Sequence, residues 1–246
     1  MCDLLAISAG FDYGPREYLP LFAERGKRNV SGWGIGFFRE GRTLVENSAE
    51  SVYHENQMHD SFQRLARVID SRMILAHISC PLIGGQHDQA AHPFTLSFLG
   101  HSWLFVHVGI VRDIDRYRTR MEPRLDVNIP SARIFEFLRD RMVSMVSEDP
   151  YLGLLSALSM ATRELVERYP GRYNYFLANE SVLLAFFNFR QLMMLKEHDT
   201  LGNVLLLTTV EEGLSGEDWR YIGLEGDSAG KFVVIGGADF LYQQSL

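Results

Sequence analysis

Short runs of apolar residues, separated by turn-forming or charged residues, recur along most of the chain. Runs of four to eight residues bounded in this way are typical of strands that are buried on both faces. The runs that predict such strands are residues 4–9, 73–77, 103–106, 173–178, 182–189, 192–196, 204–208 and 231–235. Most of the protein is therefore expected to consist of buried sheet.

One more strand is predicted where glycine alternates with larger residues, at Gly32, Gly34 and Gly36. It is expected to pair with residues 43–46 across a turn at residues 40–41. Glycine inside a strand indicates a bulge or the close approach of another part of the backbone. The same glycines also fit a sheet that is simply tightly packed.

Helical spacing of apolar residues appears in four segments. A short helix is predicted after the break at residues 14–15, and a second covers residues 57–70. Two longer helices follow, with apolar faces made by Ile134, Phe135, Leu138, Met142 and Met145, and by Leu152, Leu155, Leu158, Leu165 and Val166. The second of these ends at residues 169–171, which contain a proline and a glycine.

The order of these elements predicts the fold class. Strands come first, then two long helices, then strands again, which is typical of α+β proteins. We expect two mainly antiparallel sheets packed face to face with helices outside, a four-layer αββα sandwich. No linker divides the sequence, so residues 1–246 are expected to form one domain.

Composition narrows the classes of partner. The net charge of -7 argues against a nucleic-acid partner, because attraction to phosphate needs a basic surface. The longest apolar runs, residues 182–187 and 204–207, are too short to span a bilayer, and no positively charged leader precedes an apolar core. We therefore expect a cytoplasmic protein without a membrane partner.

The two cysteines, Cys2 and Cys80, differ in their expected chemistry. Removal of Met1 would leave Cys2 with a thiol and a free α-amine, whose reference pKa values are near 8.5 and 8. The amine can then take up the thiol's proton. The alternative is that Cys2 is simply a small residue at the head of a strand. Cys80, beside a proline, is expected to be a small core residue, and a disulfide between the two stays open.

Several segments follow Cys2 in a characteristic order: the first apolar run, the glycine strand, residues 76–78, residues 92–94 and residues 103–109. In this order, over roughly the first 140 residues, the sequence resembles the class II glutamine amidotransferases. These are N-terminal-nucleophile hydrolases, and the short stand-alone bacterial type is the most similar. The resemblance implies the αββα fold and a terminal Cys that attacks the side-chain amide of glutamine, releasing ammonia through an acyl-thioester.

The resemblance also implies a glutamine pocket, and this chain departs from its pattern at three positions. The Arg that follows Ala-His-x and holds the substrate carboxylate is Ser79 here. The Asn of the His-Asn-Gly oxyanion motif is Val108, although Gly109 is retained. The acidic residue that holds the substrate's α-amine aligns with Pro130. Because serine cannot replace a guanidinium and one oxyanion donor is lost, free glutamine is expected to be a poor substrate.

Two hypotheses follow. In the first, Cys2 acts on another amide or γ-glutamyl-type compound, with Gly109 as the remaining oxyanion donor and with His77, Ser79, His92, His107 and Val108 around the substrate. In the second, the chain is a degenerate relative that serves as a binding or regulatory subunit.

The remaining expectations concern metals, cofactors and partners. The histidine spacing does not match a metal site, and no cofactor motif occurs. Use of released ammonia would need a separate partner subunit, and assembly into a homo-oligomer stays open.

Overall fold

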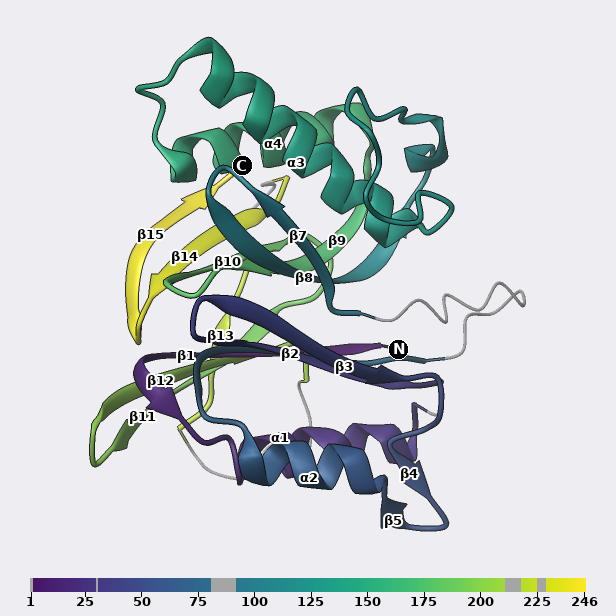
Figure 1. The fold of residues 1–246 in the computed structure, drawn as a ribbon, viewed down its shortest axis with the longest axis vertical. Coiled ribbons are helices and arrows are strands. Elements are labelled where there is room, and N and C mark those ends of the chain that lie inside the picture. The colour runs from purple at the N-terminus through teal and green to yellow at the C-terminus, as the bar shows by residue number, and fades with distance from the viewer. Residues whose placement is uncertain (1, 30, 81–91, 211–217, 225–228) are drawn as a thin grey trace.

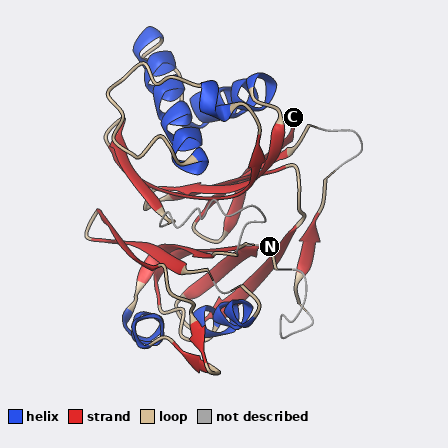
Figure 2. Ribbon diagram, turned by 90° about the vertical axis from the view of Figure 1, so that its right-hand side faces the viewer, coloured by secondary structure: helices blue, strands red, loops and turns tan. Residues whose placement is uncertain are grey.

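The computed structural model describes residues 2–29, 31–80, 92–210, 218–224 and 229–246. Two antiparallel sheets lie face to face, with helices on both outer faces (Figure 1). The same four layers are seen edge-on in the view of Figure 2. The predicted αββα sandwich is therefore confirmed.

The lower sheet contains the N-terminal strand near its centre. Its order is β13-β11-β12-β1-β6-β2-β3. The bounds are β1 Asp3–Tyr13, β2 Trp33–Arg39, β3 Arg42–Ser48, β6 Ser71–Ile78, β11 Leu192–Asp199, β12 Gly202–Thr208 and β13 Arg220–Ile222. The short pair β4 Tyr53–His54 and β5 Gln57–Met58 stands apart from it.

The upper sheet has the order β15-β14-β10-β9-β8-β7. Its strands are β7 Phe94–Phe98, β8 His101–Val111, β9 Gly171–Ala178, β10 Val182–Phe187, β14 Lys231–Gly236 and β15 Asp239–Ser245. Helices α3 Pro130–Glu148 and α4 Leu154–Arg168 cover its outer face (Figure 1).

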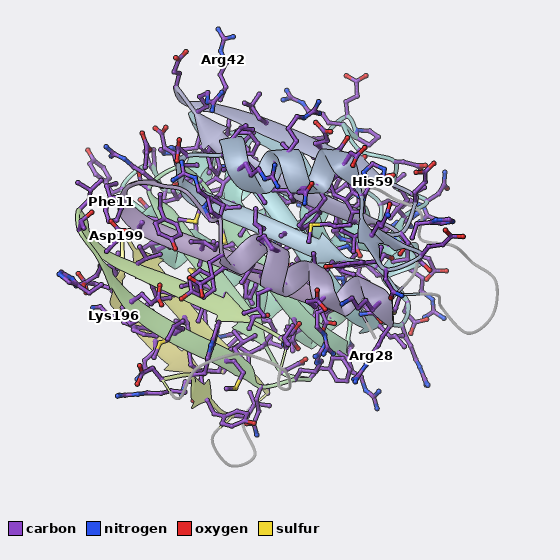
Figure 3. All side chains as sticks on the ribbon, turned by 90° about the horizontal axis from the view of Figure 1, so that it is seen from below. Phe11, Arg28, Arg42, His59, Lys196 and Asp199 are labelled. Carbon is purple, nitrogen blue, oxygen red and sulfur yellow. The ribbon has the colours of Figure 1, made fainter. Side chains whose placement is uncertain are left out.

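Helices also cover the outer face of the lower sheet. These are α1 Tyr18–Ala23 and α2 Asp60–Val68, with the 3-10 turns η1 Glu24–Lys27 below and η2 Ile114–Arg116 in the upper half. Figure 3, seen from below, shows α1 and α2 crossing this sheet, with His59 at the start of α2. None of the described helices is both long and apolar enough to cross a bilayer.

Alternation along the central strands explains why their sequences are almost wholly apolar. In β1, Leu4 and Ala6 pack between the two sheets, whereas Leu5 and Ile7 pack against the lower helices. Strand β8 divides its side chains in the same way between the intersheet core and the upper helices. Because successive side chains point to opposite faces and both faces are covered, most positions are apolar.

The glycine strand approaches the upper sheet closely, as predicted. A Cβ at Gly34 would lie 1.8 Å from the carbonyl oxygen of His92, and one at Gly36 would lie 2.9 Å from a methyl of Leu104. Glu40 and Gly41 both have positive φ, which is typical of the two-residue type I′ turn that joins β2 and β3. The predicted hairpin is confirmed, and its glycines let His92 reach the space between the sheets.

Several predicted boundaries were wrong. Residues 107–109 were expected at the end of a strand, but β8 continues through them to Val111. The second predicted helix begins at Asp60, because His59 accepts a hydrogen bond from Ser61 N–H and caps it. Strands β7, β13 and β15, together with the short pair β4 and β5, were missed because none is a continuous apolar run. The glycine-containing sequence at residues 83–87, which is typical of a loop, lies outside the described residues.

A buried charge cluster fixes the long loop that precedes α3. Arg139 contacts Glu136 Oε2 at 2.7 Å and Asp140 Oδ1 at 2.9 Å, and all three side chains are buried. Glu136 accepts hydrogen bonds from the N–H groups of Arg124 and Leu125. The cluster therefore ties the loop to the helix whose first turn lies at the candidate site.

Replacing Arg139 by Met should lower the free energy of unfolding by about 3–5 kcal/mol, because two buried carboxylates would lose their cation. The exposed pair of Arg116 and Asp113 supplies the control, since R116M should cost less than about 1 kcal/mol. Urea denaturation of both variants measures the difference. Equal losses in the two variants would contradict a stabilising role for the cluster.

Candidate active site

The candidate site begins at the first residue of the lower sheet. Asp3 pairs with Ile78 of β6, so Cys2 stands opposite the residues that follow this strand. The N–H of Cys80 donates to the Cys2 sulfur at 3.2 Å, and the two sulfur atoms are 2.9 Å apart. Both cysteines are free thiols with partly exposed side chains. Cys80 thus contacts the candidate nucleophile, whereas the sequence predicted a small core residue.

One cavity of about 130 Å³ collects residues from both sheets. Every predicted site residue lines it, and the full lining is Cys2, His77, Ser79, Cys80, His92, His107, Val108, Gly109, Ile110, Ser131 and Phe189. Pro130 does not line it, although the adjacent Ser131 does. Four other cavities of about 300 to 560 Å³ contain none of the predicted residues. The roles of the lining residues remain predictions.

Gly109 occupies a position that only glycine can fill without strain. Its φ is 154°, and a Cβ would lie 1.8 Å from the backbone oxygen of Arg172 on β9. The close contact keeps the backbone of β8 at the wall of the cavity.

Val108 directs its side chain into the intersheet core, where Cys2 also packs. An aliphatic side chain offers no hydrogen-bond donor there. Its cross-strand neighbour Asn174 exchanges hydrogen bonds with the backbone of Arg190, so its amide is already used.

Three buried histidines form much of the cavity wall. Burial lowers the pKa of His77 to about 4 and that of His107 to about 3, and it holds the pKa of His92 well below its usual range. His107 Nδ1 lies 3.0 Å from Ser131 Oγ, and the rings of His77 and His92 have centroids 4.5 Å apart. All three imidazoles are therefore neutral near pH 7.

Two ring nitrogens in this wall have no partner. Nε2 of His92 and Nε2 of His107 are buried and make no hydrogen bond to the described residues. Buried polar atoms normally have a partner, so Nε2 of His92 is available to a bound molecule or water, whereas the His107 ring also interacts with the backbone of Arg172. Within the described residues, no three His, Cys, Asp or Glu side chains are arranged as metal ligands.

Asp3 is a site residue that the sequence did not reveal. Its carboxylate is fully buried and accepts from Arg25 Nε at 3.2 Å, Asn29 Nδ2 at 2.9 Å and Arg190 Nη2 at 3.1 Å. Arg190 also donates to the Cys2 carbonyl oxygen at 2.9 Å. The network fixes the backbone of Cys2. In the sequence, the only sign of this role is that Asp3 is a charged residue at the head of an apolar strand.

The two thiols influence each other's protonation. The hydrogen bond between the two sulfur atoms lowers the pKa of Cys80 to about 6. The same hydrogen bond, together with burial, raises the pKa of the Cys2 thiol. The two thiols therefore titrate as a pair, and Cys2 needs a base before it can act as a nucleophile.

Comparison with known proteins identifies the class. A sequence profile of the class-II glutamine amidotransferases matches residues 1–208, so the chain belongs to this family. The family resemblance predicted from the sequence is confirmed.

A curated relative has a more specific name. The γ-glutamyl-hercynylcysteine sulfoxide hydrolase of Mycobacterium tuberculosis (strain CDC 1551 / Oshkosh) is 29% identical over 149 residues, which are 58% of this chain and 61% of the relative. The chain thus matches less than two thirds of that protein's length.

Solved structures agree in fold. A predicted glutamine amidotransferase from Pseudomonas aeruginosa PA01 superposes with a TM-score of 0.65 at 18% identity, covering 98% of this chain and 100% of the other. The glutamine phosphoribosylpyrophosphate amidotransferase of B. subtilis gives a TM-score of 0.66 at 10% identity, covering 99% of this chain and 49% of the other. At these identities the likeness concerns the fold alone.

The buried histidines predict how stability depends on pH. Their pKa values in the folded protein lie below the value of about 6.5 expected in the unfolded chain. Between the two values the unfolded chain binds more protons, so their contribution to stability is complete above pH 6.5 and is lost as pH falls. From pH 6.5 to 5 each histidine should add a slope of at most about 1.4 kcal/mol per pH unit.

Urea denaturation across this pH range measures that slope. H77Q should reduce it, whereas H101Q, at an exposed position, should leave it unchanged. A free energy of unfolding that stays constant between pH 6.5 and 5 would contradict the neutral state of the cavity wall.

Proposed function

We propose that the protein is an amidohydrolase that uses Cys2 as its nucleophile on a small-molecule amide with an uncharged acyl group. The observation that carries the proposal is one shared cavity. It contains Cys2, which precedes the first strand of the lower sheet, and Gly109 from the upper sheet, and the three imidazoles of its wall are neutral. Membership of the amidotransferase family supports amide chemistry at this position.

The proposed reaction starts after removal of Met1, which gives Cys2 a free α-amine. The amine accepts the thiol proton, and the sulfur attacks the amide carbon. The N–H of Cys80, which points at the Cys2 sulfur, stabilises the thiolate. The negatively charged oxygen of the tetrahedral intermediate lies beside the backbone N–H of Gly109, which stabilises it by donating a hydrogen bond.

Collapse of this intermediate breaks the C–N bond. The leaving nitrogen takes the proton from the α-amine, and the acyl group stays on Cys2 as a thioester. Water then attacks the thioester, and the acid leaves as the Cys2 thiol is restored. Arg190 holds the Cys2 carbonyl oxygen, so the reacting residue keeps its position through both steps.

The pocket favours a neutral acyl group for a physical reason. Ser79 and Pro130 stand where relatives would hold a carboxylate and an amine, and the three imidazoles are neutral. A charged amino-acid head entering this cavity would lose its hydration without gaining a partner, which costs several kcal/mol. The unpaired Nε2 atom of His92 instead suits a neutral polar group.

A γ-glutamyl-type substrate is the alternative to a neutral one, since the curated relative carries that activity in its name. In that case the α-amino and carboxyl groups would lie outside the small cavity. We further propose a reducing cytoplasm as the compartment, because it preserves the free thiols of Cys2 and Cys80. A separate ammonia-accepting subunit and a homo-oligomer belong to the same proposal.

A specific observation favours a second candidate function. Three pocket positions are altered, and the pKa of the Cys2 thiol is raised by its contact with Cys80 and by burial. Both features suit a degenerate relative that acts as a binding or regulatory subunit. The two candidate functions differ in one measurable outcome: only the amidohydrolase turns over an amide substrate.

Hydrolysis of two matched anilides tests the proposal. Butyryl-p-nitroanilide has a neutral acyl chain, whereas γ-glutamyl-p-nitroanilide adds a charged amino-acid head to a chain of similar length. We expect kcat/KM to be at least roughly tenfold higher for the butyryl compound, because tenfold corresponds to only about 1.4 kcal/mol. C2A should abolish both activities.

The outcomes separate the two candidates. Faster turnover of the γ-glutamyl compound would contradict the neutral pocket. No turnover of either compound by a folded chain that lacks Met1 would favour the binding subunit.

A further inference from the structure

The Cys80 thiol contacts the reacting sulfur but has no part in the proposed hydrolysis. The Cys80 sulfur lies 2.9 Å from that of Cys2, and the Cys80 N–H donates to the same atom at 3.2 Å. Both thiols line the same cavity and are partly exposed, so a small molecule in that cavity can reach them. The two thiols can therefore take part together in a reaction that is separate from the proposed hydrolysis.

The fold places the two cysteines where a covalent bond can close. They lie at the ends of neighbouring antiparallel strands, one residue before the pairing of Asp3 with Ile78 and two residues after it. A disulfide has a sulfur–sulfur distance of about 2.05 Å, so a modest approach of the two side chains completes it. Arg190 and the buried Asp3 fix the Cys2 backbone, and the N–H of Ser79 donates to the Gly32 carbonyl oxygen at 2.9 Å.

We propose that Cys2 and Cys80 form a reversible dithiol–disulfide couple, which small uncharged disulfides oxidise and which switches the Cys2 nucleophile off. The oxidant is a low-molecular-weight disulfide, R–S–S–R. The reductant that restores the active form is a small dithiol or thiol.

The exchange proceeds in two balanced steps. The Cys80 thiolate attacks one sulfur of R–S–S–R, so the bond from Cys80 to sulfur forms and the other half leaves as a thiolate, RS⁻. The Cys2 sulfur then attacks the Cys80 sulfur, and the second half leaves as RS⁻. The protons of the two cysteine thiols end on the two RS⁻ groups. The protein loses two electrons and two protons, and the disulfide becomes two RSH molecules.

The surroundings assign the two roles. The lowered pKa of Cys80 makes it the attacking thiolate, and the adjacent Cys2 is the resolving thiol. Neutral walls from His77, His92 and His107 favour an uncharged disulfide over a charged one. The couple uses only the two side chains, so it does not depend on removal of Met1 or on the hydrolytic activity.

The test uses bis(2-hydroxyethyl) disulfide, which is small and uncharged, on the full chain. Intact mass should show that the wild type loses two hydrogen atoms and retains no adduct, and peptide mapping should place the new link between Cys2 and Cys80. The matched variant C2S should keep one hydroxyethylthio group on Cys80, because no thiol remains to displace it. Dithiothreitol should restore the starting mass in both proteins.

A second readout follows the nucleophile itself. Oxidised wild type should resist iodoacetamide at Cys2, and reduced wild type should accept it. A wild-type chain that keeps a stable adduct, or that shows no change of mass, would overturn the proposal. If C2S does not fold, C80S provides the same contrast, since it cannot form the internal link. None of these readouts requires hydrolysis, so failure here leaves the proposed amidohydrolase function standing.

Discussion

A single buried carboxylate sets the position of the candidate nucleophile. Asp3 is fully buried and is surrounded by Arg25 and Asn29, which lie four residues apart, and by Arg190 from a distant part of the chain. A buried charge without such partners would be strongly unfavourable, so the first strand cannot shift along its neighbours without losing them. Because Arg190 also holds the Cys2 carbonyl oxygen, this one network orients the reactive residue.

The rest of the site depends on close backbone approach at two glycines. Gly34 admits the backbone of His92, and Gly109 admits that of Arg172. These contacts enclose a small cavity whose walls are imidazole, hydroxyl and aliphatic groups. The family fold is retained, and in the proposed function the pocket recognises a neutral group. A pocket of this kind selects by shape and by uncharged polar contacts.

Apolar patterning predicted the strands that are buried on both faces, and the family motifs predicted which residues would meet at the cavity. Strand β15 was missed because most of its residues are exposed, so its stability comes from pairing with β14 rather than from burial. The Asp3–Arg190 pair joins residues 187 positions apart, and nothing local in the sequence indicates it. Cys80 was misread for the same reason, since its contact with Cys2 arises only when β1 and β6 pair.

Above all, we propose that Cys2 is a reactive nucleophile toward neutral acyl groups. The most direct measurement is the intact mass and peptide map of the reduced protein after exposure to a neutral thioester acyl donor and, separately, to an electrophilic glutamine analogue. We expect Met1 to be absent, the neutral donor to leave an acyl group on Cys2, and the glutamine analogue to react far less. A chain that lacks Met1 and takes no acyl group at Cys2 would contradict the proposal.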